Sequence, residues 1–151
     1  MLAGPPVRLP KENACELPAQ RGNVLTVAGF FQVDNTLQAY SHQGSMSSEL
    51  FIVYVEDFLQ HYPPTKKTIV VIDNASFHKS ADVKARMKQW KTKNLYFQFL
   101  PPYCSELNPI EIIWHHIKHL WIKIEDYASA DSLKKAVDDI LINVKNKYTI
   151  T

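Results

Sequence analysis

The spacing of apolar residues divides most of the chain into strands and helices. Two apolar-rich segments, residues 24–33 and 36–41, flank the polar pair Asp34-Asn35 and predict an antiparallel hairpin with a tight turn. Apolar residues then recur at helical spacing from a serine cap at Ser47 or Ser48 until two prolines at 63 and 64 end the helix. The first half of the chain is therefore predicted to be strand, strand and helix.

The second half is predicted to add two strands and three helices. Residues 68–72 form a β-branched run without alternation, which is typical of a strand covered on both faces, and residues 95–100 predict another strand. Between them, Ser80 caps a basic helix whose buried stripe is Val83, Met87 and Trp90. Helices over 109–123 and 131–145 end the chain. The order β-β-α-β-α-β-α-α predicts an α/β fold with a mixed sheet flanked by helices.

Composition restricts the class of protein. The 151 residues are 46% hydrophobic and 21% charged, which is typical of one globular domain and excludes wholesale disorder or a fibrous repeat. Residues 1–22 hold four of the nine prolines and show no periodic pattern, so we expect an extended lead-in followed by a domain over 23–151.

Apolar runs and cysteines give an expectation about location. The apolar runs are too short to span a bilayer, and no signal-peptide pattern is visible at the start. Cys15 and Cys104, far apart in the sequence, fit free thiols in a reducing compartment. We therefore expect an intracellular protein without a membrane partner, in the cytoplasm or nucleoid of a bacterium or the nucleus of a eukaryote.

Positive charge is concentrated in the middle of the chain. The net charge is only +2, but residues 66–93 carry eight Lys and Arg residues against two Asp. A surface that attracts phosphate and an ordinary solvated helix face both fit this pattern. The basic candidates for a phosphate contact in and beside the helix capped by Ser80 are Lys79, Lys84, Arg86 and Lys88.

Two acidic residues are placed where a site could form. Asp73 follows the buried strand 68–72 and so lies at the edge where α/β sheets bind ligands, although it could equally cap its own loop. Glu111 lies in the first turn of the predicted helix 109–123, where it could complete a capping box with Asn108. The apolar stripe of that helix is Ile110, Ile113, Trp114, Ile117, Leu120 and Trp121, and Glu111, His115 and Lys118 line a neighbouring face.

Three segments carry a more specific pattern: residues 69–75, Ile-Val-Val-Ile-Asp-Asn-Ala, with His78; residues 100–103, Leu-Pro-Pro-Tyr; and residues 107–111, Leu-Asn-Pro-Ile-Glu, with Trp114. They resemble the second and third catalytic segments of the DDE transposases, in the mariner-like and bacterial insertion-sequence branch. The 37 residues between Asp73 and Glu111 are similar to the family's spacing. The resemblance covers residues 20–145 approximately and implies a ribonuclease H-like fold.

The resemblance implies metal-dependent DNA cleavage and strand transfer. Three acidic side chains of the family hold Mg²⁺ or Mn²⁺, and Asp73 and Glu111 match the second and third of them. Asn74 and His78 match the loop that follows the second acid, and His115 borders the same face. Lys118 and the basic helix are candidates for contact with DNA phosphate, so DNA is the implied partner.

The chain departs from the family in two places. Cys104-Ser105-Glu106 replaces the family's Ser-Pro-Asp, which leaves Glu111 in place. The first acid of the family lies on a strand before the hairpin, and residues 1–22 contain no Asp, while Glu12 and Glu16 do not fit the motif. Asp34 is better explained by the hairpin turn.

We therefore expect a partial catalytic domain that lacks the first strand and is inactive alone. The gap should make the chain unstable, or be filled by its own N-terminal segment or by another chain, either a second copy or a full-length transposase. The alternative function is a non-catalytic remnant that binds DNA or regulates full-length transposase.

Three weaker patterns favour ordinary structural roles. His115 and His119 have the spacing of a zinc pair but no third ligand, so surface histidines are expected. Trp90, Trp114 and Trp121 fall on apolar stripes and are expected in the core. A glycosidase carboxylate pair lacks a matching aromatic cleft.

Overall fold

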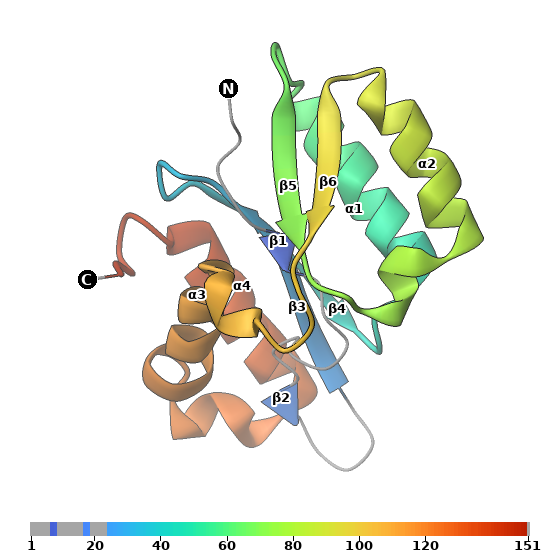
Figure 1. Ribbon diagram of the computed structural model, residues 1–151. Helices are drawn as coiled ribbons and strands as arrows, with labels where there is room; N and C mark the ends of the chain where they lie inside the picture. The colour runs from blue at the N-terminus through green and yellow to red at the C-terminus, as the bar shows by residue number, and fades with distance from the viewer. Residues whose placement is uncertain (1–6, 9–16, 19–23, 151) are drawn as a thin grey trace.

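The computed structural model describes residues 7–8, 17–18 and 24–150 and shows two small sheets flanked by helices (Figure 1). The strands and α-helices are β1 Val7–Arg8, β2 Leu17–Pro18, β3 Val24–Phe31, β4 Leu37–Gln43, α1 Ser48–His61, β5 Thr68–Ile72, α2 Ala81–Lys91, β6 Leu95–Phe99, α3 Ile110–His116 and α4 Ala130–Asn143. The predicted order from the hairpin onward is confirmed. Within the described residues, no helix has the length and apolar character needed to cross a bilayer.

The hairpin β3–β4 forms as the sequence predicts. The strands pair antiparallel from Leu25 opposite Gln43 to Phe31 opposite Leu37. Asn35 takes a φ of 66°, and the Asp34 carboxylate accepts a hydrogen bond from the Thr36 backbone N at 2.9 Å. This hydrogen bond lowers the pKa of Asp34, whose side chain therefore stabilises the turn.

Strand β3 lies between two hydrophobic clusters because its side chains alternate between its faces. Ala28 and Phe30 belong to the first cluster, which α1, α2, β5 and β6 complete. Leu25, Val27 and Phe31 belong to the second cluster, which is completed by α3, the turn that follows it and α4. Neither cluster is complete without β3, so the two halves of the molecule share one strand.

The second edge of β3 is paired by the N-terminal segment. In β1, Val7 pairs with Phe30 of β3 and Arg8 pairs with Gly29. In β2, Leu17 pairs with Leu25 of β3. Both pairings are antiparallel and lie on the edge opposite β4, which is where we expect a strand to be missing. Strand β1 also approaches β5, although β6 is the strand that pairs with β5 among the described residues. Glu12, Cys15 and Glu16 lie outside the described residues.

Serine caps begin three helices. The Ser47 hydroxyl accepts from the Leu50 backbone N at 3.2 Å, and the Ser80 hydroxyl accepts from the Val83 N at the same distance, as predicted. The last helix begins at Ala130, one residue earlier than expected, because Ser129 accepts from the Ser132 N at 3.0 Å.

The predicted continuous helix over 109–123 is wrong in its second half. Helix α3 ends at His116 and is followed by a π-helical turn, Ile117–Trp121, in which the Ile122 backbone N donates to the Ile117 carbonyl at 3.2 Å. The wider turn changes the face that each later residue presents. Leu120 is consequently 64% exposed rather than in the core, whereas Trp121 packs against the second cluster.

Candidate active site

Asp73 lies directly after β5, at the carboxyl edge of the parallel pair β5–β6 (Figure 1). Its Oδ1 accepts a hydrogen bond from the Ala75 backbone N at 3.1 Å, and its side chain is 16% exposed. Asp73 therefore does cap its own loop, and the oxygen that accepts this hydrogen bond is Oδ1. The same residue is placed at the sheet edge where α/β proteins bind ligands.

His78 holds Asp73 from the interior. Its Nδ1 lies 3.1 Å from the Asp73 carbonyl O and 3.2 Å from Oδ1, so this nitrogen carries the proton and donates. The ring is fully buried, with centroids 4.7 Å from Phe51 and 4.4 Å from Phe77. Because the imidazole is packed on both sides, it gives the Asp73 carboxylate a fixed donor.

The loop after β5 is also tied to β6 and to α1. The Asn74 side-chain amide donates to the Leu100 carbonyl, and the Leu100 N donates to the Ile72 carbonyl at 2.7 Å. The Ser48 hydroxyl donates to the Phe77 carbonyl at 3.1 Å. These bonds bring Asn74 and His78 together with Asp73, and they keep the loop in one conformation.

Glu111 lies in the first turn of α3, where the helix begins without a side-chain cap. The predicted capping box is wrong, because the fully buried Asn108 carboxamide has no hydrogen-bond partner among the described residues. The Glu111 backbone N donates instead to the Asn108 carbonyl at 3.0 Å. A buried carboxamide without partners is costly, and such groups in native proteins commonly mark a missing water, ion or ligand.

The two carboxylates are the right type of ligand for a hard divalent cation, but the described residues supply fewer ligands than a complete site needs. Carboxylate oxygens are the ligands that Mg²⁺ and Mn²⁺ prefer, and Asp73 and Glu111 supply them. In the described part of the chain, no three His, Cys, Asp or Glu residues form a group that could hold a metal ion. His115 and Lys118, farther along the chain, are exposed, and the His115 ring lies 4.7 Å from that of His119.

The basic candidates differ in their surroundings. Lys84 and Lys88 are exposed on α2, and no carboxylate of the described residues lies within 4 Å of either ammonium. Arg86 instead lies 3.5 Å from Glu56 of α1. Lys79 sits over the Phe99 ring, 6.0 Å from its centroid, at the carboxyl end of β6. Lys79 is therefore the basic candidate placed at the same sheet edge as Asp73.

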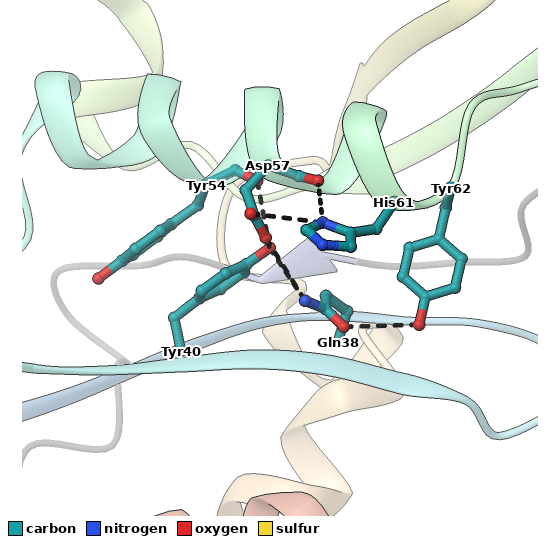
Figure 2. Close-up of polar contacts among 6 residues, drawn as sticks. All are labelled: Gln38, Tyr40, Tyr54, Asp57, His61 and Tyr62. Atoms are coloured by element: carbon teal, nitrogen blue, oxygen red, sulfur yellow. Dashed lines mark hydrogen bonds and ion pairs between the residues drawn. The ribbon is translucent and has the colours of Figure 1, made fainter.

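Sequence reasoning missed a polar network between β4 and α1 (Figure 2). The Tyr40 hydroxyl donates to Asp57 Oδ2 at 2.6 Å, and its ring stacks on Tyr54 with centroids 4.3 Å apart. His61 Nδ1 lies 3.4 Å from Asp57 Oδ1. Burial and the hydrogen bond to Asp57 raise the pKa of Tyr40. No local pattern in the sequence pairs these two elements, since Tyr54 and Asp57 lie 14 and 17 residues after Tyr40.

The chain belongs to the DDE superfamily endonuclease family, whose model matches residues 8–134. Its fold is similar to that of the Mos1 transposase in a paired-end complex with the left transposon end, at a TM-score of 0.60 and 15% identity. That match covers 94% of this chain and 45% of the other. The fold is therefore ribonuclease H-like, as expected.

A second structure with a similar fold is the simian T-cell lymphotropic virus intasome in complex with the PP2A regulatory subunit B56 gamma. It matches with a TM-score of 0.52 and 10% identity over all of this chain and 52% of the other. This chain thus spans about half the length of both structures. No curated protein matches it in sequence.

Proposed function

We propose that this chain is most of the catalytic domain of a DDE transposase in the mariner-like and insertion-sequence branch, with residues 23–151 as the domain. Its reaction is metal-dependent cleavage and transfer of DNA strands, and its partner is DNA. The observation that carries the proposal is the Asp73 carboxylate, held by His78 at the carboxyl edge of β5 in a chain that belongs to this family.

Each residue of the site has a distinct part in this proposal. Asp73 and Glu111 would hold the divalent cation, and His78 and Asn74 position Asp73 through the contacts described above. The chemistry that such a cation would supply is activation of water or a 3′-hydroxyl and stabilisation of the leaving oxygen. Lys79 lies in the loop that follows Asp73, and Lys118 lies in the π-helical turn that follows α3; both contact DNA phosphate in this proposal.

The proposal includes low activity of the chain alone. DDE chemistry uses three acids, and no third acid joins Asp73 and Glu111 among the described residues. Strands β1 and β2 occupy the edge of β3 where the family carries its first acid. In this proposal a second copy or a full-length transposase supplies that acid by a strand that displaces β1 and β2 from this edge.

Metal binding tests the two acids directly. We expect the chain to bind Mn²⁺ weakly, and Asp73→Asn and Glu111→Gln each to weaken binding about tenfold or more, measured by electron paramagnetic resonance of free Mn²⁺. Asp34→Asn is the matched control, because it removes the same charge from a turn carboxylate. Equal effects of Asp34→Asn and Asp73→Asn would refute the site.

Plasmid nicking tests whether the chain acts alone. We expect no Mg²⁺- or Mn²⁺-dependent conversion of supercoiled plasmid above that of the Asp73→Asn variant. Nicking by the wild-type chain that disappears in Asp73→Asn would show that this chain completes its own site, and would overturn the proposal of low activity.

The exposed lysines of α2 favour a second candidate function, a DNA-binding regulator without catalysis. In that case DNA binding persists in Asp73→Asn and falls in Lys84→Gln/Lys88→Gln. Arg86→Gln should change DNA affinity less, because Glu56 already neutralises this guanidinium. Loss of DNA binding in Asp73→Asn with metal present would favour the enzyme instead.

A further inference from the structure

Two lysines are gathered on one tyrosine at the start of β6. The Lys67 ammonium lies 4.9 Å from the centroid of the Tyr96 ring, and the Lys91 ammonium lies 5.7 Å from the same centroid. Lys67 precedes β5, Lys91 ends α2, and Tyr96 is half-buried in β6. Three parts of the chain thus bring two positive charges to one ring, although 23 residues lie between the two lysines in the sequence.

The ring attracts each ammonium but does not neutralise either charge. A cation over a tyrosine face gains about 0.5–1 kcal/mol at an exposed site, and this contact leaves the positive charge in place. No carboxylate of the described residues lies within 4 Å of Lys67 or Lys91. An anion beside the ring would therefore be attracted by both ammonium groups.

Some other cations of the described residues are compensated. Lys147 also lies over a ring, 5.4 Å from the Tyr148 centroid, but Asp139 approaches it at 4.0 Å. Arg86 and Lys93 share Glu56, at 3.5 and 3.9 Å. The Lys67–Tyr96–Lys91 arrangement, which we call the lysine clamp, places two ammonium groups on one ring with no acid of the described residues within 4 Å.

The clamp lies at the opposite end of the β5–β6 pair from Asp73. Strand β6 is an edge strand in the described part of the chain, because it pairs only with β5. Lys79 sits over Phe99, three residues beyond Tyr96. Because side chains alternate along a strand, the Tyr96 and Phe99 rings project from opposite faces of β6. Lys79 therefore belongs to the Asp73 end of the sheet and is not part of the clamp.

We propose that the lysine clamp binds the phosphate backbone of DNA beside the start of β6, away from the acidic edge. This inference rests on the proposed function, because it takes DNA as the ligand. The proposal adds a DNA-contact surface at Lys67 and Lys91. These two lysines are not among the basic candidates identified from the sequence. The clamp reads no bases, because ammonium contacts to phosphate carry no sequence information.

The test compares two double variants of the full chain that each remove two positive charges. Lys67→Gln/Lys91→Gln removes the clamp, and Lys135→Gln/Lys147→Gln is the control at exposed lysines elsewhere. The affinity for a 30-base-pair duplex is measured by fluorescence anisotropy across a salt series. We expect the clamp variant to bind about tenfold more weakly and its salt slope to fall by about 1.8, with a small change in the control.

Two substitutions of Tyr96 distinguish the clamp from a general effect of charge. Tyr96→Phe keeps the ring and should leave DNA affinity unchanged, whereas Tyr96→Leu removes the ring without removing charge and should weaken binding. Acetylation of lysines with and without duplex, read by mass spectrometry, should show protection of Lys67 and Lys91. Thermal melting of each variant confirms that it is folded.

Two results would overturn the clamp. One is equal DNA affinity of the clamp and control variants, and the other is unprotected Lys67 and Lys91 in the presence of bound duplex. The Mn²⁺ titration fails or succeeds independently, since neither lysine belongs to the metal site. Clamp-dependent DNA binding without Mn²⁺ binding at Asp73 would refute the catalytic proposal and leave the clamp intact.

Discussion

His78 is an imidazole in contact with two phenylalanines, and its Nδ1 is directed at the backbone carbonyl and the carboxylate of Asp73. The other ring nitrogen, Nε2, is buried without a hydrogen-bond partner among the described residues. A buried polar atom of this kind lowers stability and is retained where it has a purpose. Holding one carboxylate oxygen of Asp73 in place is a sufficient purpose.

The hydrogen bond from Tyr40 to Asp57, outside the candidate active site, can be tested by one substitution. Replacing Tyr40 with Phe removes the 2.6 Å hydrogen bond to Asp57 while keeping the stack on Tyr54 (Figure 2). We expect the free energy of unfolding at pH 7 to fall by about 1–2 kcal/mol, because the carboxylate loses its shortest donor. Urea denaturation followed by circular dichroism measures this change.

The same variant should alter the response to alkaline pH. The pKa of Tyr40 in the folded chain lies above its ordinary value of 10.0, so its contribution is complete below pH 10 and is lost as pH rises above that value. Between pH 9.5 and 11 the wild type should lose stability more steeply than Tyr40→Phe. Parallel slopes for the two proteins would contradict the role of Tyr40. Tyr54, whose pKa burial also raises, remains in both.

At the scale of elements, α1 and α2 are joined by one carboxylate. Glu56 Oε1 accepts from the Trp90 indole N at 2.8 Å and lies near Arg86 and Lys93. It lines a groove of about 750 Å³ between the two helices. The basic face of α2 is therefore divided, with one part turned to α1 and the other to solvent.

Glu56→Ala should loosen this helix pair. It leaves the buried Trp90 indole N–H without its acceptor and two cations without their acid, so we expect a loss of about 1–3 kcal/mol in urea denaturation. Glu56→Gln, which keeps an acceptor oxygen, should lose less. Glu125→Ala is the control, because Glu125 is exposed. An effect of Glu56→Ala no larger than that of the control would show that the helices are held by apolar packing alone.

At the scale of the whole molecule, β3 connects the two hydrophobic clusters. Phe51 is fully buried in the first cluster and Ile113 in the second. Because both clusters need β3, loss of packing on one face should remove support from the other. The molecule should therefore unfold as one unit rather than as two lobes.

Paired substitutions test this unity. We expect Phe51→Ala to lower stability by about 3–5 kcal/mol and Ile113→Ala by about 2–5 kcal/mol. Fluorescence of Trp90 reports the first cluster and that of Trp114 the second, once each of the other tryptophans is replaced by Phe. The two signals should share one denaturant midpoint in wild type and in both variants. Separate midpoints would show two independent units.

The sequence predictions that depend only on neighbouring residues are confirmed by the structure. The hairpin turn at Asp34-Asn35 and the caps at Ser47 and Ser80 depend on neighbours within three residues, and all form as predicted. The exposure of Leu120 and the failure of Asn108 as a cap were not predictable, because a π-helical turn and a buried helix start depend on packing against other elements.

The sequence by itself determined the hairpin, the strands β5 and β6 and most of the helices, and it singled out Asp73 and Glu111 as candidates, because periodicity and motif spacing are local properties of the chain. Only the tertiary structure decided that Asp73 is held by His78, that Arg86 faces Glu56, and that Lys67 meets Lys91 on Tyr96. Each of these contacts joins side chains whose distance is set by how strands and helices pack. The physical reason is that burial and charge pairing are decided between elements, where sequence separation carries no information about distance.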